Sequence, residues 1–383
     1  MSKHIIYCAD GTWNNPNQDE NDDRSVDPTN VYKLFVCLEG DASPESLRAA
    51  DEQEKFLVQN GATLQAAKYV HGVGDSRNQI IRILSGAFGS GVISRVVRGY
   101  TFISRNYEAG DHIHIAGFSR GAYTARALAG LIASQGLLAK ALTADKDLAY
   151  RKGAEAWYRY RKTSLSKPSA LAHLAEVTSN LPAFLSRDSL RDQDLIPVNR
   201  ISTVAVWDTV GAMGFPEFST DRTRVDAFKF ADTKLSAKVS KGFHAIAVDE
   251  ERHDFIPTLW DAADNVTQLL FPGAHSDVGG GYPMINGESG LSDCALQWMM
   301  DRLSENGVRF SATLPIPVKP DPTGTAHKPW RHIPFNVPTV FVGRRTFPAG
   351  MTIDASIEKR RAAAGIFGEP GEAATRYEPS NLP

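Results

Sequence analysis

The chain has 383 residues, 42% of them hydrophobic, and its 42 Lys and Arg residues nearly balance its 44 Asp and Glu residues. This length permits one large α/β domain or two smaller ones. The near-neutral charge argues against a nucleic-acid partner, because it offers no basic surface to phosphate groups.

Cysteine content and hydropathy indicate the redox state and the cellular location of the chain. Three cysteines without a C-x-x-C spacing indicate a reduced protein with neither a disulfide framework nor a cysteine metal site. The N-terminal apolar run ends at Asp10 without a cleavage site, so it is not a signal peptide. No stretch approaches the ~20 apolar residues of a membrane-spanning helix. We therefore expect a soluble chain made in the cytoplasm, with any secretion using a route that ignores signal peptides.

Short apolar runs alternate along the chain with longer helical patterns. The expected strands are His4–Ala9, Lys68–Gly72, His112–Ala116, Ile201–Trp207, Phe243–Val248 and Val266–Phe271. The expected helices are Gln79–Tyr107, Gly121–Ser134 and Leu291–Asn306. The charged segment Asp41–Thr63 is expected to be a surface excursion. Near-continuous apolar strands alternating with helices predict an α/β fold, with a mainly parallel sheet and helices on both faces.

We expect one catalytic domain over residues 1–312. Within it, residues 138–199 form an insertion without obvious strands, which is either a helical packing insert or a cap over the active site. Residues 313–383 form a proline-rich extension that packs on the domain or trails from it, and Arg360–Pro383 looks loosely ordered.

A possible nucleophile lies in the sequence G-F-S-R-G, residues 117–121, between an expected strand and an expected helix. In a nucleophile elbow the serine, here Ser119, occupies a strained turn that lifts its hydroxyl clear of the sheet. The helix that follows points its N-terminus at the site, which places the Arg120 N–H to stabilise an oxyanion. This pattern predicts an α/β-hydrolase-like fold; the alternative is a small-residue turn without chemistry.

The base we expect is His275, in the sequence P-G-A-H-S-D-V-G-G-G-Y after the strand Val266–Phe271. A histidine downstream of the serine, in a loop after the last core strand, fits the chain order Ser, Asp, His of this fold. His253, which flanks another strand, is the rival.

Two aspartates compete for the role of the acid. Asp208 ends one strand in V-W-D-T-V-G, and Asp249 ends the next in A-V-D-E-E-R. Either can orient an imidazole from a neighbouring loop. The usual position after the second strand beyond the elbow favours Asp249, whereas the tight turn after Asp208 favours Asp208, so the residues alone leave both open.

The first expected strand runs into C-A-D-G-T-W, residues 8–13. A glycine loop after a core strand can supply backbone N–H groups to an oxyanion hole, and Gly11 and Thr12 are the candidates. The alternative is a turn in which Asp10 caps its own loop.

Four motifs together resemble one family: D-G-T, G-F-S-R-G-A, D-T-V-G and H-S-D-V-G-G-G-Y, at Asp10–Thr12, Gly117–Ala122, Asp208–Gly211 and His275–Tyr282. This is the α/β-hydrolase family that includes phospholipase effectors delivered by bacterial type VI secretion, the first of the lipase effector families. The resemblance spans about Lys3 to Glu305. It implies a triad of Ser119, Asp208 and His275 and hydrolysis of phospholipid acyl esters.

These observations predict a serine hydrolase that cleaves carboxylic esters through an acyl-enzyme, without a metal or organic cofactor. The first interpretation is a phospholipase acting as a secreted antibacterial effector, with a lipid substrate, a membrane surface, an immunity protein and a secretion spike protein as partners. The second is a housekeeping carboxylesterase on a non-membrane ester. The third is a catalytically silent binding protein that keeps the fold.

Overall fold

The computed structural model describes residues 2–11, 27–45, 52–72, 88–164, 190–210, 233–332, 335–336, 342–366, 368–369 and 372–383. Its main sheet contains the strands β1 (His4–Ala9), β2 (Asp41–Ala42), β3 (Glu52–Gln59), β4 (Ala62–Val70), β5 (His112–Phe118), β8 (Ile201–Trp207), β9 (Val239–Ala247), β10 (Val266–Phe271) and β11 (Thr352–Ile353). The order across this nine-stranded sheet is β11-β10-β9-β8-β5-β1-β4-β3-β2. Neighbours from β11 to β4 pair in parallel, and β3 and β2 extend the edge in antiparallel pairing.

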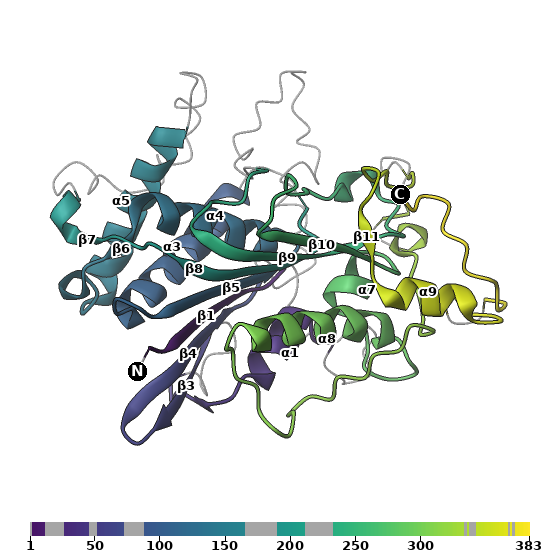
Figure 1. Ribbon diagram of the computed structural model, residues 1–383, viewed down its shortest axis with the longest axis horizontal. Helices are drawn as coiled ribbons and strands as arrows, with labels where there is room; N and C mark the ends of the chain where they lie inside the picture. The colour runs from purple at the N-terminus through teal and green to yellow at the C-terminus, as the bar shows by residue number, and fades with distance from the viewer. Residues whose placement is uncertain are drawn as a thin grey trace.

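Helices cover both faces of the sheet, as Figure 1 shows. One face carries α3 (Phe88–Asn106), α4 (Arg120–Gln135) and α5 (Lys146–Ser164), and the other carries α1 (Asn30–Cys37), α7 (His275–Gly279) and α8 (Gly290–Glu305). A last helix, α9 (Ala355–Ala362), lies near β10. The predicted fold class, α/β with a mainly parallel sheet and helices on both faces, is confirmed.

Side-chain alternation in β1 explains the two cores. Ile5 and Tyr7 contribute to the core under α3 and α4, whereas Ile6 and Cys8 contribute to the core under α1 and α8. Successive side chains of a strand point to opposite faces, so a strand buried on both faces is apolar throughout. The expected bounds of β1, β8 and β10 are those observed.

The prediction for Asp41–Thr63 was wrong. This segment contains β2 and β3, which form the antiparallel edge of the sheet. Its charge misled the prediction, because an edge strand tolerates charged residues that deter pairing with other chains. Here Lys68 of β4 pairs with Glu52 and Glu54 of β3 at 2.6 and 3.1 Å.

The described part of the insertion at residues 138–199 packs against the domain. The two-residue strands β6 (Leu137–Leu138) and β7 (Leu195–Ile196) pair where the insertion begins and ends. Between them, α5 contacts α3 and α4, and its Trp157 is buried in their core. Residues 165–189 lie outside the described residues, so the cap interpretation stays a prediction.

The C-terminal extension packs on the sheet. β11 pairs with β10, and Ile357 of α9 is buried against Val248 and Leu270. The loose order expected for Arg360–Pro383 does not hold at its first residue, because the Arg360 guanidinium is buried and donates to two backbone oxygens. Most of the described residues after it are half-buried or exposed. The apolar contacts of the extension come from separated residues such as Ile357, Tyr377 and Leu382, so they leave no apolar periodicity in the sequence. The domain boundary at residue 312 stays a prediction.

Of the helices in these described ranges, none has both the length and the apolar character that crossing a bilayer requires.

Candidate active site

Ser119 lies in a strained turn between β5 and α4. Its φ and ψ are 57° and −122°, a conformation that non-glycine residues rarely adopt and that is maintained mainly at functional sites. The close packing explains the flanking glycines, since a Cβ at Gly117 would overlap the Gly121 backbone and one at Gly121 would overlap the Ala9 carbonyl. The geometry is therefore that of the predicted elbow.

His275 and Asp208 meet at the carboxyl ends of the parallel strands. His275 begins α7 after β10, and its Nδ1 lies 2.6 Å from Oδ2 of Asp208, which directly follows β8. Since β8 and β5 are neighbours, Ser119 lies beside this pair, and its N–H donates to the Trp207 carbonyl at 3.1 Å. The His275 ring packs 4.5 Å from the ring of Phe118, the residue before Ser119.

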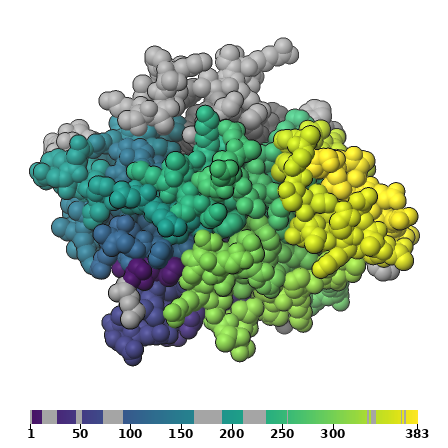
Figure 2. Space-filling view, viewed as in Figure 1, coloured from purple at the N-terminus to yellow at the C-terminus, as the bar shows by residue number. Residues whose placement is uncertain are grey.

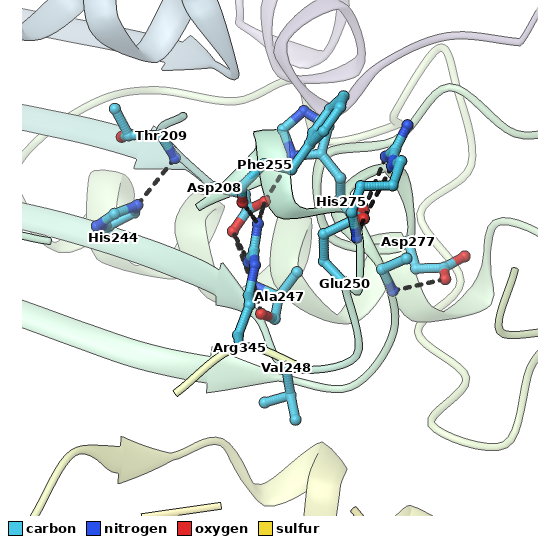
Figure 3. A network of polar contacts seen from close by, with 12 residues as sticks. Asp208, Thr209, His244, Ala247, Val248, Glu250, Phe255, His275, Asp277 and Arg345 are labelled. Atoms are coloured by element: carbon cyan, nitrogen blue, oxygen red, sulfur yellow. Dashed lines mark hydrogen bonds and ion pairs between the residues drawn. The ribbon is translucent and has the colours of Figure 1, made fainter. Parts of the chain in front are cut away.

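Arg345 completes the surroundings of Asp208 (Figure 3). Its Nη1 and Nη2 donate to Oδ1 and Oδ2 of Asp208 at 2.7 and 2.9 Å. The backbone N–H of Ala247 also donates to Oδ1, at 3.0 Å. No local motif marks Arg345 in the sequence, because it lies in the proline-rich extension 137 residues from Asp208.

The charges of Arg345, Asp208 and His275 influence one another. Burial alone would raise the pKa of Asp208, but the Arg345 guanidinium and the His275 hydrogen bond outweigh it and hold that pKa well below its usual range. Burial lowers the pKa of His275, and the Asp208 carboxylate opposes that effect. An ionised Asp208 only accepts hydrogen bonds, so Nδ1 of His275 carries the proton and Nε2 is left as the basic nitrogen.

Asp249, the other candidate acid, is engaged elsewhere. Its Oδ2 accepts from the Gly273 N–H at 2.7 Å and from the Tyr377 hydroxyl at 2.8 Å. Burial raises its pKa to about 6. In the structure the bond to the His275 imidazole belongs to Asp208, and Asp249 instead joins the turn before His275 to the C-terminal residues.

The charged run after Asp249 supports the histidine from its backbone side. Glu250 accepts the His275 N–H at 3.2 Å and forms a buried, two-pronged ion pair with Arg252. The Arg252 guanidinium lies 3.6 Å from the centre of the Phe255 ring, which contacts the His275 ring edge-on. The rival base His253 is exposed on the short 3₁₀ turn His253–Phe255.

His244 of β9 stabilises the turn after Asp208. Its Nε2 accepts the Thr209 N–H at 3.1 Å, and burial lowers its pKa to about 3. A neutral ring is required for this acceptor role. The contact helps to hold Asp208 at its unusual φ of 34°. The sequence offered no signal beyond a histidine within a strand.

The three predicted oxyanion-hole donors, Gly11, Thr12 and Arg120, differ in how they agree with the structure. Arg120 is the first residue of α4, where N–H groups point beyond the helix end. The prediction for Gly11 does not agree with the structure, because its N–H donates to Asp10 Oδ1 at 2.7 Å. This is the alternative in which Asp10 caps its own loop. Thr12 lies outside the described residues.

The cysteines and Asp10, which are of residue types that can ligate a metal, are buried. The three cysteines, Cys8, Cys37 and Cys294, are buried and free. Asp10 accepts from Thr29 and Tyr69 at 2.8 and 2.6 Å, and burial raises its pKa to about 6. Across the described ranges, His, Cys, Asp and Glu side chains form no group of three or more that could hold a metal ion.

Known proteins agree with the family resemblance. Residues 3–302 match the family described as "T6SS, Phospholipase effector Tle1-like, catalytic domain". The chain belongs to this family. This Tle1-like chain is 28% identical over 268 residues to "Uncharacterized protein YEL023C" of Saccharomyces cerevisiae, covering 66% of the chain and 32% of the yeast protein.

Two solved structures are more distantly similar. An uncharacterised protein from Pseudomonas aeruginosa has a TM-score of 0.41 and 17% identity, over 81% of this chain and 46% of that one. The Tle1 effector bound to the VgrG spike of the type VI secretion system has a TM-score of 0.39 and 18% identity, over 74% of this chain and 51% of that one. The Tle1-like chain thus spans 32% to 51% of the length of these relatives.

Proposed function

We propose that this chain is a serine hydrolase that cleaves the acyl ester bonds of phospholipids. One observation carries the proposal. The buried His275 imidazole is bonded at 2.6 Å to the buried Asp208 carboxylate, at the carboxyl ends of the strands, where the strained Ser119 directly follows β5. Residues of these types in this chain order are the components of acyl transfer on α/β sheets. The lipid substrate is proposed from the family, whose description names a phospholipase effector.

In the proposed acylation step, Nε2 of His275 takes the proton of the Ser119 hydroxyl as its oxygen attacks the ester carbonyl. Asp208 holds the imidazole in the required tautomer and stabilises its charged form. The oxyanion accepts a hydrogen bond from the Arg120 N–H at the start of α4, and the positive end of the helix dipole stabilises it further. The imidazolium then gives its proton to the leaving alcohol, which leaves the acyl group on Ser119.

In the second step, water replaces the alcohol. His275 removes a proton from the water, which attacks the acyl-serine carbonyl, and the fatty acid departs as Ser119 regains its proton. The Arg120 N–H stabilises the second oxyanion in the same way. No step consumes a cofactor, and the enzyme returns to its starting protonation state.

We further propose that the chain acts as a secreted antibacterial effector on a membrane surface, with a secretion spike protein and an immunity protein as partners. The type VI effector family supports this role. Secretion through a spike would need no signal peptide.

The proposal is tested with purified protein on phospholipid vesicles and on short p-nitrophenyl esters. We expect fatty acid release from the vesicles, with the activity lost in Ser119→Ala. Ser292→Ala is the matched control, because Ser292 is a buried serine of α8 whose hydroxyl donates to the backbone oxygen of Ser289. A fluorophosphonate probe should label the wild type and Ser292→Ala, but not Ser119→Ala.

The other interpretations predict different results. A carboxylesterase for non-membrane esters would hydrolyse the p-nitrophenyl esters and leave vesicles intact. A silent binding protein would hydrolyse neither substrate and resist the probe. Activity that survives in Ser119→Ala would contradict the assigned nucleophile.

A further inference from the structure

We propose that Arg345 is a positioning residue for catalysis, through which the C-terminal segment completes the active site by clamping Asp208. The inference rests on the proposed serine hydrolase function. It adds a residue beyond the family match, which ends at residue 302.

The contacts of Arg345 leave Asp208 a single arrangement. The guanidinium meets both carboxylate oxygens in parallel hydrogen bonds, the geometry that arginine alone provides. It also donates to the carbonyl oxygens of Ala247 and Phe255. With the bonds from Ala247 N–H and His275 Nδ1, the carboxylate is surrounded by donors and faces the imidazole with Oδ2.

The segment that carries Arg345 is anchored on both sides of it. Val342 forms a backbone bridge with Arg252, and β11 pairs with β10. Asn381 donates to the carbonyl oxygens of Val248 and Arg345, at 3.0 and 3.1 Å. Figure 2 shows the C-terminal residues, in yellow, gathered in one mass against the green part of the chain that contains β10 and α7. The position of Arg345 is therefore set by tertiary contacts.

The ion pair has an electrostatic effect besides the geometric one. A buried carboxylate without a cation tends to take up a proton, because burial disfavours its charge. The Arg345 charge keeps Asp208 ionised and also makes it harder to add a proton to the His275–Asp208 pair. Removing that charge eases proton uptake by the pair, whichever of the two residues holds the proton.

The test compares Arg345→Met and Arg345→Lys with wild type. We expect Arg345→Met to lower kcat by about 100-fold with KM within about twofold, because a slightly misplaced catalytic group costs about this much. The acid limb of its pH–rate profile should move up by about one pH unit. Arg345→Lys keeps the charge but not the two parallel bonds, so kcat should fall about 10-fold with the acid limb unmoved.

Arg360→Met is the matched control. Arg360 is another buried arginine of the same segment, but it donates to the backbone oxygens of Pro322 and Gly324 and does not touch Asp208. It should keep the wild-type kcat and pH profile. If Arg360→Met shows the changes of Arg345→Met, packing of the segment explains them and the proposal is overturned.

Two further results would overturn it. One is a folded Arg345→Met enzyme with the kcat and acid limb of wild type. The other, which decides the matter if Arg345→Met does not fold, is an Arg345→Lys enzyme with unchanged kcat.

A measurement without substrate separates this inference from the proposed function. NMR titration of labelled histidine, with the His275 signal identified by its loss in His275→Gln, should show the titration of the His275–Asp208 pair, followed at the His275 ring, moved to higher pH in Arg345→Met. If the wild type hydrolysed no ester, the proposed function would fail, and this shift would still decide whether Arg345 controls the pair. An unmoved His275 titration in Arg345→Met would overturn the inference alone.

Discussion

Histidines gather at both ends of the parallel strands, and the two groups have different partners. At the carboxyl ends, His275 is bonded to the Asp208 carboxylate. At the amino ends, His4 stacks on His112 with ring centres 4.7 Å apart, and its Nδ1 lies 3.0 Å from Nε2 of His114. The other nitrogen of His114 meets the hydroxyl of Thr203 at 2.9 Å.

The difference shows that the partner of a buried histidine, more than its burial, decides its chemistry. Burial and, to a lesser extent, neighbouring histidines lower the pKa of His4 to about 4 and that of His114 well below its usual range. Burial also lowers the pKa of His275, but an anionic partner opposes it. Of His4, His114 and His275, the last is the one whose charged form has an anionic partner, so we assign the other two a role in packing.

The largest expected effect is on kcat, and it distinguishes His275 from the histidines at the amino ends of the strands. His275→Gln should lower kcat on the order of 10⁶-fold, as loss of the base does in other serine hydrolases. His114→Gln should leave kcat within about twofold while lowering the melting temperature, because it disturbs a buried hydrogen bond. Steady-state kinetics and thermal unfolding check both. Comparable losses of kcat in the two variants would remove the distinction.

The next effect separates two aspartates at the carboxyl ends. Asp208→Asn should lower kcat by about 10⁴-fold, because an amide cannot hold the required tautomer or stabilise the imidazolium. Asp249→Asn, the same change one strand away, should cost less than about 10-fold. Single-turnover acylation with a p-nitrophenyl ester measures each. The reverse order would make Asp249 the acid.

The pH dependence of the rate tests the charge state of His275. The base must be neutral to act, and burial lowers its pKa from the ordinary value of 6.5. Therefore the acid limb of the kcat/KM profile should be centred below pH 6.5. Asp208 stays ionised through this range, since its pKa is far lower. An acid limb centred above pH 6.5 would contradict this picture.

The smallest effect concerns stability at the amino ends. The pKa of His4 is about 4 in the folded chain and 6.5 when unfolded, so the unfolded chain binds the proton first as the pH falls. The stability that the neutral His4 contributes to the folded chain is thus present above pH 6.5 and is lost as the pH falls from 6.5 to 4. Between pH 7 and pH 5, wild type should lose about 1 kcal/mol more unfolding free energy than His4→Gln, allowing for solvent screening.

Urea unfolding of both proteins at the two pH values measures this difference. The comparison with His4→Gln is needed because buried Asp10 and Asp249 titrate in the same pH range with the opposite effect on stability. Burial raises their pKa values to about 6, so protonating them as the pH falls increases the unfolding free energy of both proteins. Equal pH dependence in the two proteins would mean that the stacked ring is not desolvated.

Much of the central site could be predicted because its signals are local. The strand before Ser119, its two glycines and the following helix lie within one short segment, and close packing at the elbow leaves no room for larger residues. The oxyanion prediction at Gly11 failed for a local reason as well, since the sequence could not show whether its N–H faces the site or the Asp10 side chain.

The choice between Asp208 and Asp249 was not local. Both end buried parallel strands, and both lie near the loop that carries His275. The decision depends on Arg345, which compensates the charge of one carboxylate, while Tyr377 donates to the other. Neither partner has a motif, and both lie in the proline-rich extension, residues 313–383.

The sequence by itself determined the strand–elbow–helix unit, the alternation that builds the sheet and the residue types available for acyl transfer, because backbone preferences and side-chain periodicity act over a few neighbouring residues. Only the tertiary structure decided which carboxylate meets the imidazole, that a distant arginine clamps it, and that a charged segment extends the sheet. These depend on contacts between residues far apart in the chain, and the burial they create sets the energy of each charge.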